Sequence, residues 1–220
     1  MINNSPWLFN ARKTAAGMTA RTANGIRILQ GRRARGMSNP SPEVLQNQKI
    51  AAILWPLFRA AAGMIRDMFT SVPSGQYAAN QWFSINRVSA IDLTDPENPV
   101  LDPTGLIYQR GLMTPTDLTS AVADTSLGTV VINWPTLVAD SSQDALDLFT
   151  VVIRDRNNGN VTSIISGSER STGTFDYTVP VGFLVTGNVL DIYGSFMARD
   201  ENPNHGLTSE TRRINTTVVA

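Results

Sequence analysis

The sequence predicts an α+β protein that is mainly β. It begins with an extended basic arm, continues with a helical hairpin and ends in a seven-stranded β-sandwich. Basic residues are concentrated in the first third of the chain, apolar residues then recur at helical spacing, and short β-prone runs separated by turn residues follow from Pro115 onward. We expect four segments: the arm over 1–40, the helical hairpin over 41–92, a proline-rich linker over 93–114 and the sandwich over 115–220.

The charge of the chain is divided between two regions. Residues 1–70 carry ten basic and two acidic side chains, whereas residues 71–220 carry eight basic and sixteen acidic ones. The net charge of zero therefore combines a region of +8 with a region of −8. Such a separation indicates two surfaces with different partners. It favours binding and assembly over catalysis, because a dense cationic segment binds phosphate groups or acidic protein surfaces.

Arginine supplies sixteen of the eighteen basic residues. Its planar guanidinium group binds carboxylates and phosphates with two parallel hydrogen bonds, which suits buried interfaces. A compositional bias of the genome would give the same count, and both explanations stay open here.

Composition also excludes several classes of protein. The chain contains no cysteine, which excludes disulfides, thiolate nucleophiles and most structural zinc sites. The first residues lack the continuous apolar run of a signal peptide. The most apolar segment, 50–58, is far shorter than the roughly 20 residues that a spanning helix needs. We therefore expect no signal peptide and no transmembrane helix.

Residues 1–40 show neither a helical nor an alternating pattern, and we expect an extended arm with a short hairpin around Asn24-Gly25. That dipeptide accepts the positive φ angles of a type I′ turn. The arm is too small to bury a core of its own, so a partner would have to order it. The sequence leaves three roles open for it: binding to a nucleic-acid backbone, anchoring to acidic neighbouring proteins, or a solvated tail.

A long helix is predicted over 42–70, and a second one over 76–91. Ser41 is the expected N-cap, with Pro42 at the first helical position, and Pro56 predicts a kink or break near Ile53. The apolar face of the first helix consists of Ile50, Ile53, Leu54, Leu57, Phe58, Ala61, Ile65 and Met68. The residues expected to be buried in the second helix are Tyr77, Trp82, Phe83, Ile85, Val88 and Ile91. This face predicts packing against the sandwich or against other subunits, whereas a membrane interface fits the pattern less well.

Three prolines between residues 92 and 103 exclude a helix or a central strand there, and a further strand is expected over 106–109. From Pro115 the strands recur at the spacing of an immunoglobulin-like or fibronectin-III-like sandwich, with Asn157-Asn158-Gly159 as a hairpin turn and Trp134 at the centre of the core. The expected strands are 118–123, 129–134, 148–154, 161–166, 173–179, 189–198 and 209–219.

Three features carry a resemblance to a known family. They are the arm ending in Gly31-Arg32-Arg33-Ala34-Arg35 with the Asn39-Pro40-Ser41-Pro42 turn, the helix headed by Gln46, Gln48 and Lys49, and the strand Thr129–Trp134. Together they resemble a family of small Bacteroidota and phage proteins known only as a domain of unknown function. The arm, proline and glutamine-headed helix also look like several small phage structural proteins. The resemblance implies a non-enzymatic role in a particle.

The titratable residues do not form a predicted active site. The single histidine, His205, lies in a turn-rich segment, where we expect an exposed loop. Asp140, Asp144 and Asp147 lack the glycine and terminal glutamate of a calcium loop, so we expect a solvated loop. The segment 31–36 lacks the ending of a phosphate-binding loop. We therefore expect no catalytic residue, no metal site and no cofactor.

The sequence favours a structural component of a multi-subunit particle, a phage virion. Its partners would be other copies of the chain and other virion proteins, with possible nucleic-acid contact through the arm and no small-molecule substrate, in the virion or the host cytoplasm. The residues expected to bind partners are Arg21, Arg27, Arg32, Arg33, Arg35, Ile53, Leu54, Leu57 and Phe58. The alternatives are a surface adhesion module that recognises glycan or protein, and a nonspecific DNA-binding protein.

Overall fold

A computed structural model describes residues 18–23, 26–31, 40–69, 77–137, 143–165, 167–199 and 207–220, the first two ranges by their backbone alone. Two compact units divide the chain, residues 1–41 and 42–220. In the first unit, β1 (Met18–Ala23) pairs antiparallel with β2 (Ile26–Gly31), and Ala23 lies opposite Ile26. This pairing confirms the hairpin predicted around Asn24-Gly25.

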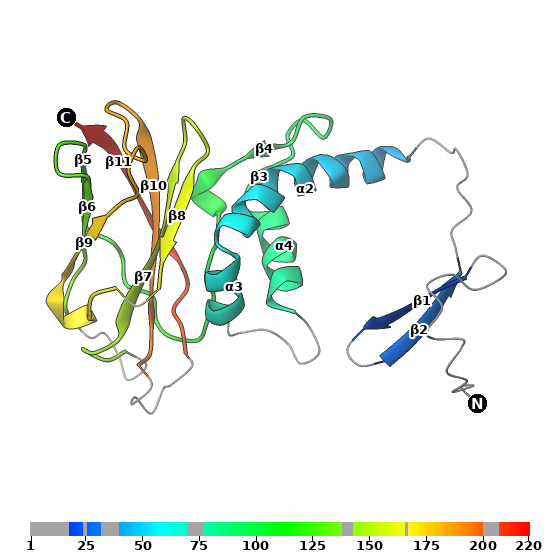
Figure 1. The fold of residues 1–220 in the computed structure, drawn as a ribbon, viewed down its shortest axis with the longest axis horizontal. Coiled ribbons are helices and arrows are strands. Elements are labelled where there is room, and N and C mark those ends of the chain that lie inside the picture. The colour runs from blue at the N-terminus through cyan, green and yellow to red at the C-terminus, as the bar shows by residue number, and fades with distance from the viewer. Residues whose placement is uncertain are drawn as a thin grey trace. The chain divides into compact units, whose positions relative to one another are not determined.

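The second unit is α+β and mainly β, as predicted (Figure 1). Its helices are α2 (Pro42–Ala60), α3 (Ala62–Met68) and α4 (Ala78–Ser89). A two-residue pair, β3 (Ile91–Asp92) with β4 (Val100–Leu101), and the 3-10 turn η1 (Pro103–Gly105) follow. The strands of the sandwich are β5 (Ser120–Asp124), β6 (Thr129–Asn133), β7 (Leu148–Asp155), β8 (Val161–Ile164), β9 (Thr174–Thr178), β10 (Val189–Met197) and β11 (Arg212–Val219), with η2 (Arg170–Thr172) before β9.

All seven predicted strands of the sandwich are present, and they form one curled, mixed sheet in the order β8-β7-β10-β11-β5-β6-β9. The neighbours are antiparallel except β11 and β5, which run parallel where Val218 lies opposite Ala123. This pairing joins the two layers of the sandwich at one edge. Gly159 has a φ of 74° at the predicted hairpin turn between β7 and β8, a conformation that glycine adopts without strain.

The core of the sandwich lies between its two layers and includes Trp134, as predicted. Its ring stacks on Phe149 with 4.3 Å between centroids and meets Phe196 edge-on at 5.5 Å. The indole N–H donates to the carbonyl oxygen of Arg170 at 2.9 Å. The one polar atom of this large side chain is thus satisfied in the interior.

The long predicted helix is interrupted later than expected. The chain remains helical through Ile53 and Pro56, and the break lies at Ala61, whose φ and ψ are −117° and 19°. Pro56 and Ala52 are both exposed, so water can hydrogen-bond the Ala52 carbonyl that the proline leaves without a donor. The break between two helices therefore lies at Ala61 and not near Ile53, where it was predicted.

The second core cluster lies between the helices and the outer face of the sheet. Phe58 of α2 meets Trp82 of α4 with 5.7 Å between centroids, and Trp82 meets Tyr108 at 6.2 Å. Tyr108 in turn contacts Tyr193 of β10 at 5.1 Å. The helices therefore pack as predicted against each other and against the sandwich of the same chain.

Two of the residues predicted to be buried in the second helix are exposed, and a polar one is buried instead. Tyr77 is 58% exposed and Val88 is 84% exposed, whereas Trp82 and Asn86, one turn apart, are fully buried. The Asn86 amide donates to the carbonyl oxygens of Trp82 and Ile107 and accepts from the Ile107 N–H. These bonds satisfy a buried polar group and attach α4 to the segment that follows η1.

The strand expected over 106–109 is absent. This segment is held instead by side chains, because Thr211 accepts hydrogen bonds from the N–H groups of Tyr108 and Gln109 at 3.1 and 2.9 Å. Gln109 also donates to Thr150 of β7 at 2.8 Å. Side-chain acceptors thus replace a strand partner.

Candidate functional site

The arginines predicted to bind partners are described only in part. Arg21 lies in β1 opposite Ile28, and Arg27 lies in β2 opposite Thr22. Arg32, Arg33 and Arg35 fall outside the described residues. Their anchoring role remains a prediction.

The predicted helix residues lie in the core between the helices and the sheet. Leu54, Leu57 and Phe58 are 1%, 5% and 6% exposed, and Ile53 is half-buried against the same cluster. Their contacts are therefore with their own chain. None of the helices among the described residues is long and apolar enough to cross a membrane.

Four carboxylates lie along the β3–β4 segment and form a surface that we call the acidic patch: Asp92 in β3, Asp95 and Glu97 in the loop before β4, and Asp102 directly after β4. All four are exposed. Asp92 accepts hydrogen bonds from the hydroxyl and N–H of Thr94, and Asp102 accepts the equivalent pair from Thr104. These bonds lower the pKa of both carboxyls, and a bond from Asn98 lowers that of Asp95. Aspartate carboxyls are ionised at neutral pH even at their ordinary pKa, so the patch is anionic there, and the lowered pKa values extend the ionisation of Asp92, Asp95 and Asp102 to more acidic pH.

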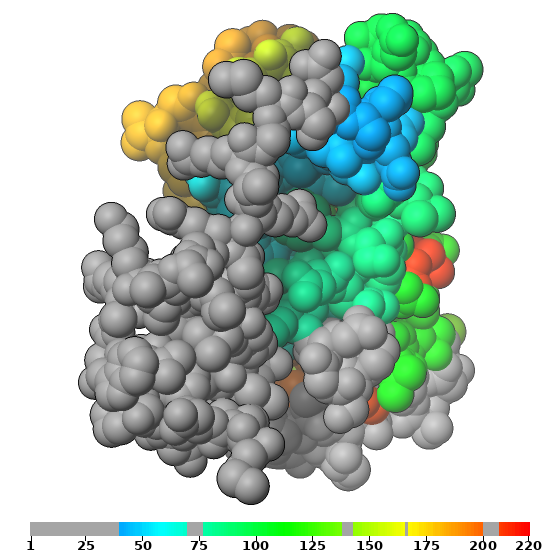
Figure 2. Space-filling view, turned by 90° about the vertical axis from the view of Figure 1, so that its right-hand side faces the viewer, coloured from blue at the N-terminus to red at the C-terminus, as the bar shows by residue number. Residues whose placement is uncertain are grey.

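A groove lies between the acidic patch and the first turns of α2. Its volume is about 570 Å³, and its lining includes Glu43, Leu45, Lys49 and the Pro96-Glu97 pair. Lys49 donates to the carbonyl oxygen of Glu97 and holds the two walls together. Figure 2 shows the first turns of α2, in blue, next to the green surface of this loop. The lining combines Glu43 and Glu97 with apolar surface, and the ammonium group of Lys49 offsets one of the two negative charges. The remaining charge and the acidic patch beside the groove suit a basic segment with apolar neighbours.

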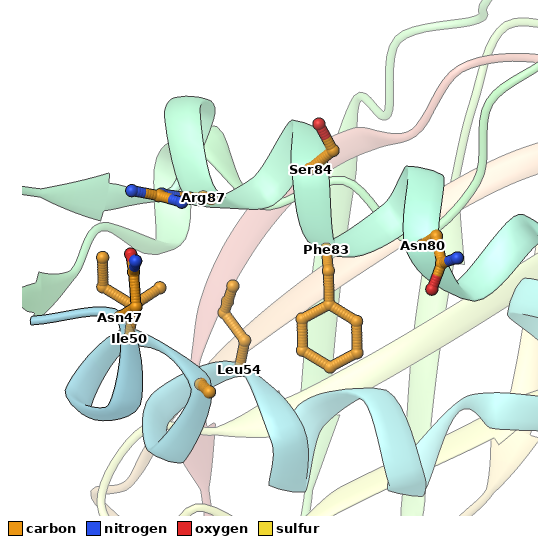
Figure 3. Close-up of a pocket in the computed structure, with 8 residues that line it drawn as sticks. Asn47, Ile50, Leu54, Asn80, Phe83, Ser84 and Arg87 are labelled. Carbon is orange, nitrogen blue, oxygen red and sulfur yellow. The ribbon is translucent and has the colours of Figure 1, made fainter. Parts of the chain in front are cut away.

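A second groove, of about 480 Å³, lies between α2 and α4 (Figure 3). Ile50 and Leu54 of α2 face Phe83 of α4, and Asn47 and Arg87 lie at one end. Its lining contains no carboxylate and no histidine. The groove therefore offers amide and guanidinium donors but no pair for acid–base catalysis.

The described residues contain no group of three or more potential metal ligands. His205 and Asp140 lie outside the described part of the chain. Asp147, expected in a solvated loop, is instead fully buried and pairs with the equally buried Arg170 at 3.2 Å. Burial raises the pKa of Asp147, and the N–H of Asp144 and the charge of Arg170 oppose that rise. The sequence-based expectation was wrong because Asp147 lies directly before β7, where its backbone oxygen accepts from the Arg170 N–H at 2.7 Å and its carboxylate meets the Arg170 side chain.

The adhesion alternative requires aromatic side chains on the sandwich loops. Among the described residues, the large apolar side chains exposed on those loops are aliphatic, such as Leu127, Leu137 and Val181. The exposed aromatic residues of the described ranges, Trp55 and Tyr77, belong to the helical part. This surface gives no support to recognition of glycan rings by stacking.

Comparison of the chain with models of known protein families found no match, and neither did comparison with curated protein sequences.

Proposed function

We propose that this protein is a non-enzymatic structural subunit of a multi-subunit particle and that this particle is a phage virion. Its basic arm anchors it to neighbouring copies. The family resemblance stated above points in the same direction. The observation that carries the proposal is the distribution of charge between the two units.

Charge separates at the boundary between the two units. Seven of the eighteen basic residues and no acidic residue precede Pro42, so the compact unit holds eleven basic residues and all eighteen acidic ones. Opposite charges on two parts of one chain attract between copies as well as within one. Such complementarity steers association and fixes its register.

The acidic patch and the groove beside it provide a receiving surface for the arm of a neighbouring copy. Glu43 and Glu97 line the groove together with Lys49, and the exposed carboxylates of Asp92, Asp95 and Asp102 lie beside it. Arginine binds carboxylates with two parallel hydrogen bonds, so three arginines within four residues of the arm, Arg32 to Arg35, suit this surface.

The experiment measures self-association by size-exclusion chromatography with light scattering, as a function of salt. We expect wild-type protein to associate at low salt, and the triple variant R32Q/R33Q/R35Q to remain monomeric while its compact unit melts as in the wild type. The variant R59Q/R66Q/R87Q is the matched control, because it removes the same charge from exposed positions of the compact unit. Replacing Asp92, Asp95 and Glu97 by amides should weaken association as strongly as the arm variant.

Equal association of the arm variant and the control would refute the anchoring proposal. Titration with duplex DNA tests the nucleic-acid alternative. Binding by the arm that falls by a factor of about 10³ or more between ~50 and ~200 mM salt, without self-association, would favour a DNA-binding protein.

A further inference from the structure

Three arginines converge on one buried carboxylate at the outer face of the sheet. The side chain of Asp191 in β10 is fully buried. Arg156 donates to both of its oxygens, at 2.8 and 2.7 Å. Arg213 of β11 donates through Nε at 2.9 Å and through Nη2, and Arg154 of β7 approaches at 3.4 Å. We call these four residues the arginine cluster.

The register of three neighbouring strands brings Arg154 and Arg213 to Asp191, and Arg156 reaches it from the turn that follows β7. Arg154 lies opposite Asp191, and Arg213 lies opposite Tyr193, two residues further along β10. Tyr193 belongs to the core beneath the helices, whereas Leu190 and Ile192 belong to the interior of the sandwich. Since side chains alternate along a strand, the cluster lies on the helix-facing side of the sheet. The helices cover the cluster only in part, because the side chains of Arg154, Arg156 and Arg213 are 16%, 35% and 18% exposed, respectively.

The charges in the arginine cluster do not balance. Three guanidinium groups share one carboxylate, which leaves an excess of two positive charges. Asp102 acts electrostatically on Arg213, but its own carboxylate is exposed to water and accepts from Thr104. Arg154 is the least engaged of the three. Its one contact with Asp191 is 3.4 Å long, and its Nε is buried and has no partner among the described residues.

We propose that the arginine cluster binds a phosphate group on its solvent side. Asp191 holds the three guanidinium groups together from beneath, and its hydrogen bonds account for only part of their donors. A phosphate monoester or inorganic phosphate carries about 1.5 to 2 negative charges at neutral pH, which is close to the excess. Its several acceptor oxygens match the planar donor forks, so phosphate fits better than the single charge of a carboxylate. This proposal is independent of the arm and of assembly.

Calorimetric titration of the full-length protein with inorganic phosphate at low salt tests the proposal. We expect saturable binding, weakened about tenfold or more in R156Q, because that variant loses charge-assisted hydrogen bonds to the ligand. R154Q should weaken binding similarly, and it should fold normally because Arg154 contributes only the longest of the contacts to Asp191. R156K, which keeps the charge and loses the fork, should bind with intermediate affinity.

The matched control is R212Q, which removes an adjacent arginine that pairs with the exposed Asp117 outside the cluster. It should bind phosphate within about twofold of the wild type. The phosphate group could come from a phosphate monoester or from a nucleic-acid backbone, and titration with a nucleoside 5′-monophosphate and with a dinucleotide that lacks a terminal phosphate distinguishes these two sources. Binding of the first alone identifies a monoester ligand, and binding of both identifies a nucleic-acid backbone. Absence of saturable binding by wild-type protein, or unchanged affinity in both R154Q and R156Q, would overturn the proposal.

Discussion

Replacement of Asp191 by asparagine tests whether the arginine cluster stabilises the sheet. The substitution keeps the size of the side chain and removes its negative charge. Arg156 and Arg213 lose charge-assisted hydrogen bonds of 2.7 to 2.9 Å, and three positive charges are left around a neutral amide. Mutual repulsion of the guanidinium groups then adds to the loss.

The expected loss of stability follows from the burial of the Asp191 side chain. Removing one partner of a buried ion pair costs about 3–5 kcal/mol. The arginines are 16–35% exposed and can turn toward water, so we expect the lower end, about 3 kcal/mol in the free energy of unfolding. For a chain of this size, each kcal/mol lowers Tm by roughly 2–4 °C, which gives a decrease of about 6–12 °C.

The effect should depend on pH. Burial pushes the pKa of Asp191 upward, but the hydrogen bonds and charges of Arg156 and Arg213 outweigh burial, so its pKa lies below the ordinary value. At low pH, the carboxylate of Asp191 therefore takes up a proton at a higher pH in the unfolded chain than in the folded chain. The stability that this carboxylate provides is complete above about pH 5 and is lost as the pH falls through ~4 toward the folded pKa. The difference between wild type and variant should shrink over that range.

Urea denaturation at pH 7 and at pH 3.5 measures both effects. D117N is the control, because Asp117 also pairs with an arginine, at 3.0 Å, but its side chain is 86% exposed. We expect that control to lose no more than about 0.5 kcal/mol. Equal losses in the two variants, or a loss in D191N that does not change with pH, would refute this account of the cluster.

Two further predictions concern packing. An alanine Cβ at Gly105 would lie 1.6 Å from the backbone oxygen of Ser89, so G105A should lose about 2 kcal/mol or more of stability. A Cβ at Gly63 would have no atom within 4 Å, so G63A should gain up to about 1 kcal/mol. Equal urea midpoints for the two variants would contradict this prediction. Trp82→Ala should lower the free energy of unfolding by about 4 kcal/mol. Because the core cluster of Trp82 includes Tyr193 of the sheet, calorimetry should still show one transition for residues 42–220, and separate melting of the helices would contradict the shared core.

The strands of the sandwich could be predicted because turn residues separate them and local patterning decides each one. The core position of Trp134 followed from the same pattern, since it ends a β-prone run. The outcome for α4 shows the limit of this approach. Hydropathy favoured Val88 as a buried residue, but the helix turns Asn86 inward, because the Ile107 backbone supplies the partners that the amide needs. Those partners lie outside the helix, and local patterning does not reveal them.

The arginine cluster was not predicted for a similar reason. The signal in the sequence is one aspartate within the apolar run Val189–Tyr193, which is unusual for a buried strand. Its partners are Arg154 of β7, Arg156 in the turn after β7 and Arg213 of β11, and pairing across strands depends on register. The buried pair of Asp147 and Arg170 likewise joins residues 23 positions apart. Composition fixes how many charges there are, and tertiary structure decides which of them meet.

The high arginine content has a structural cause in the compact unit. Arg170 is fully buried, pairs with Asp147 at 3.2 Å and lies 3.9 Å from the centroid of the Phe196 ring. A flat, weakly hydrated guanidinium group can stack on a ring and bind a carboxylate with its edge at the same time, whereas a compact ammonium group satisfies only one such geometry well. Arg156 likewise needs two donors to reach both oxygens of Asp191. At these positions lysine would leave buried acceptors unpaired, so a compositional bias of the genome alone does not explain the arginines of the sandwich.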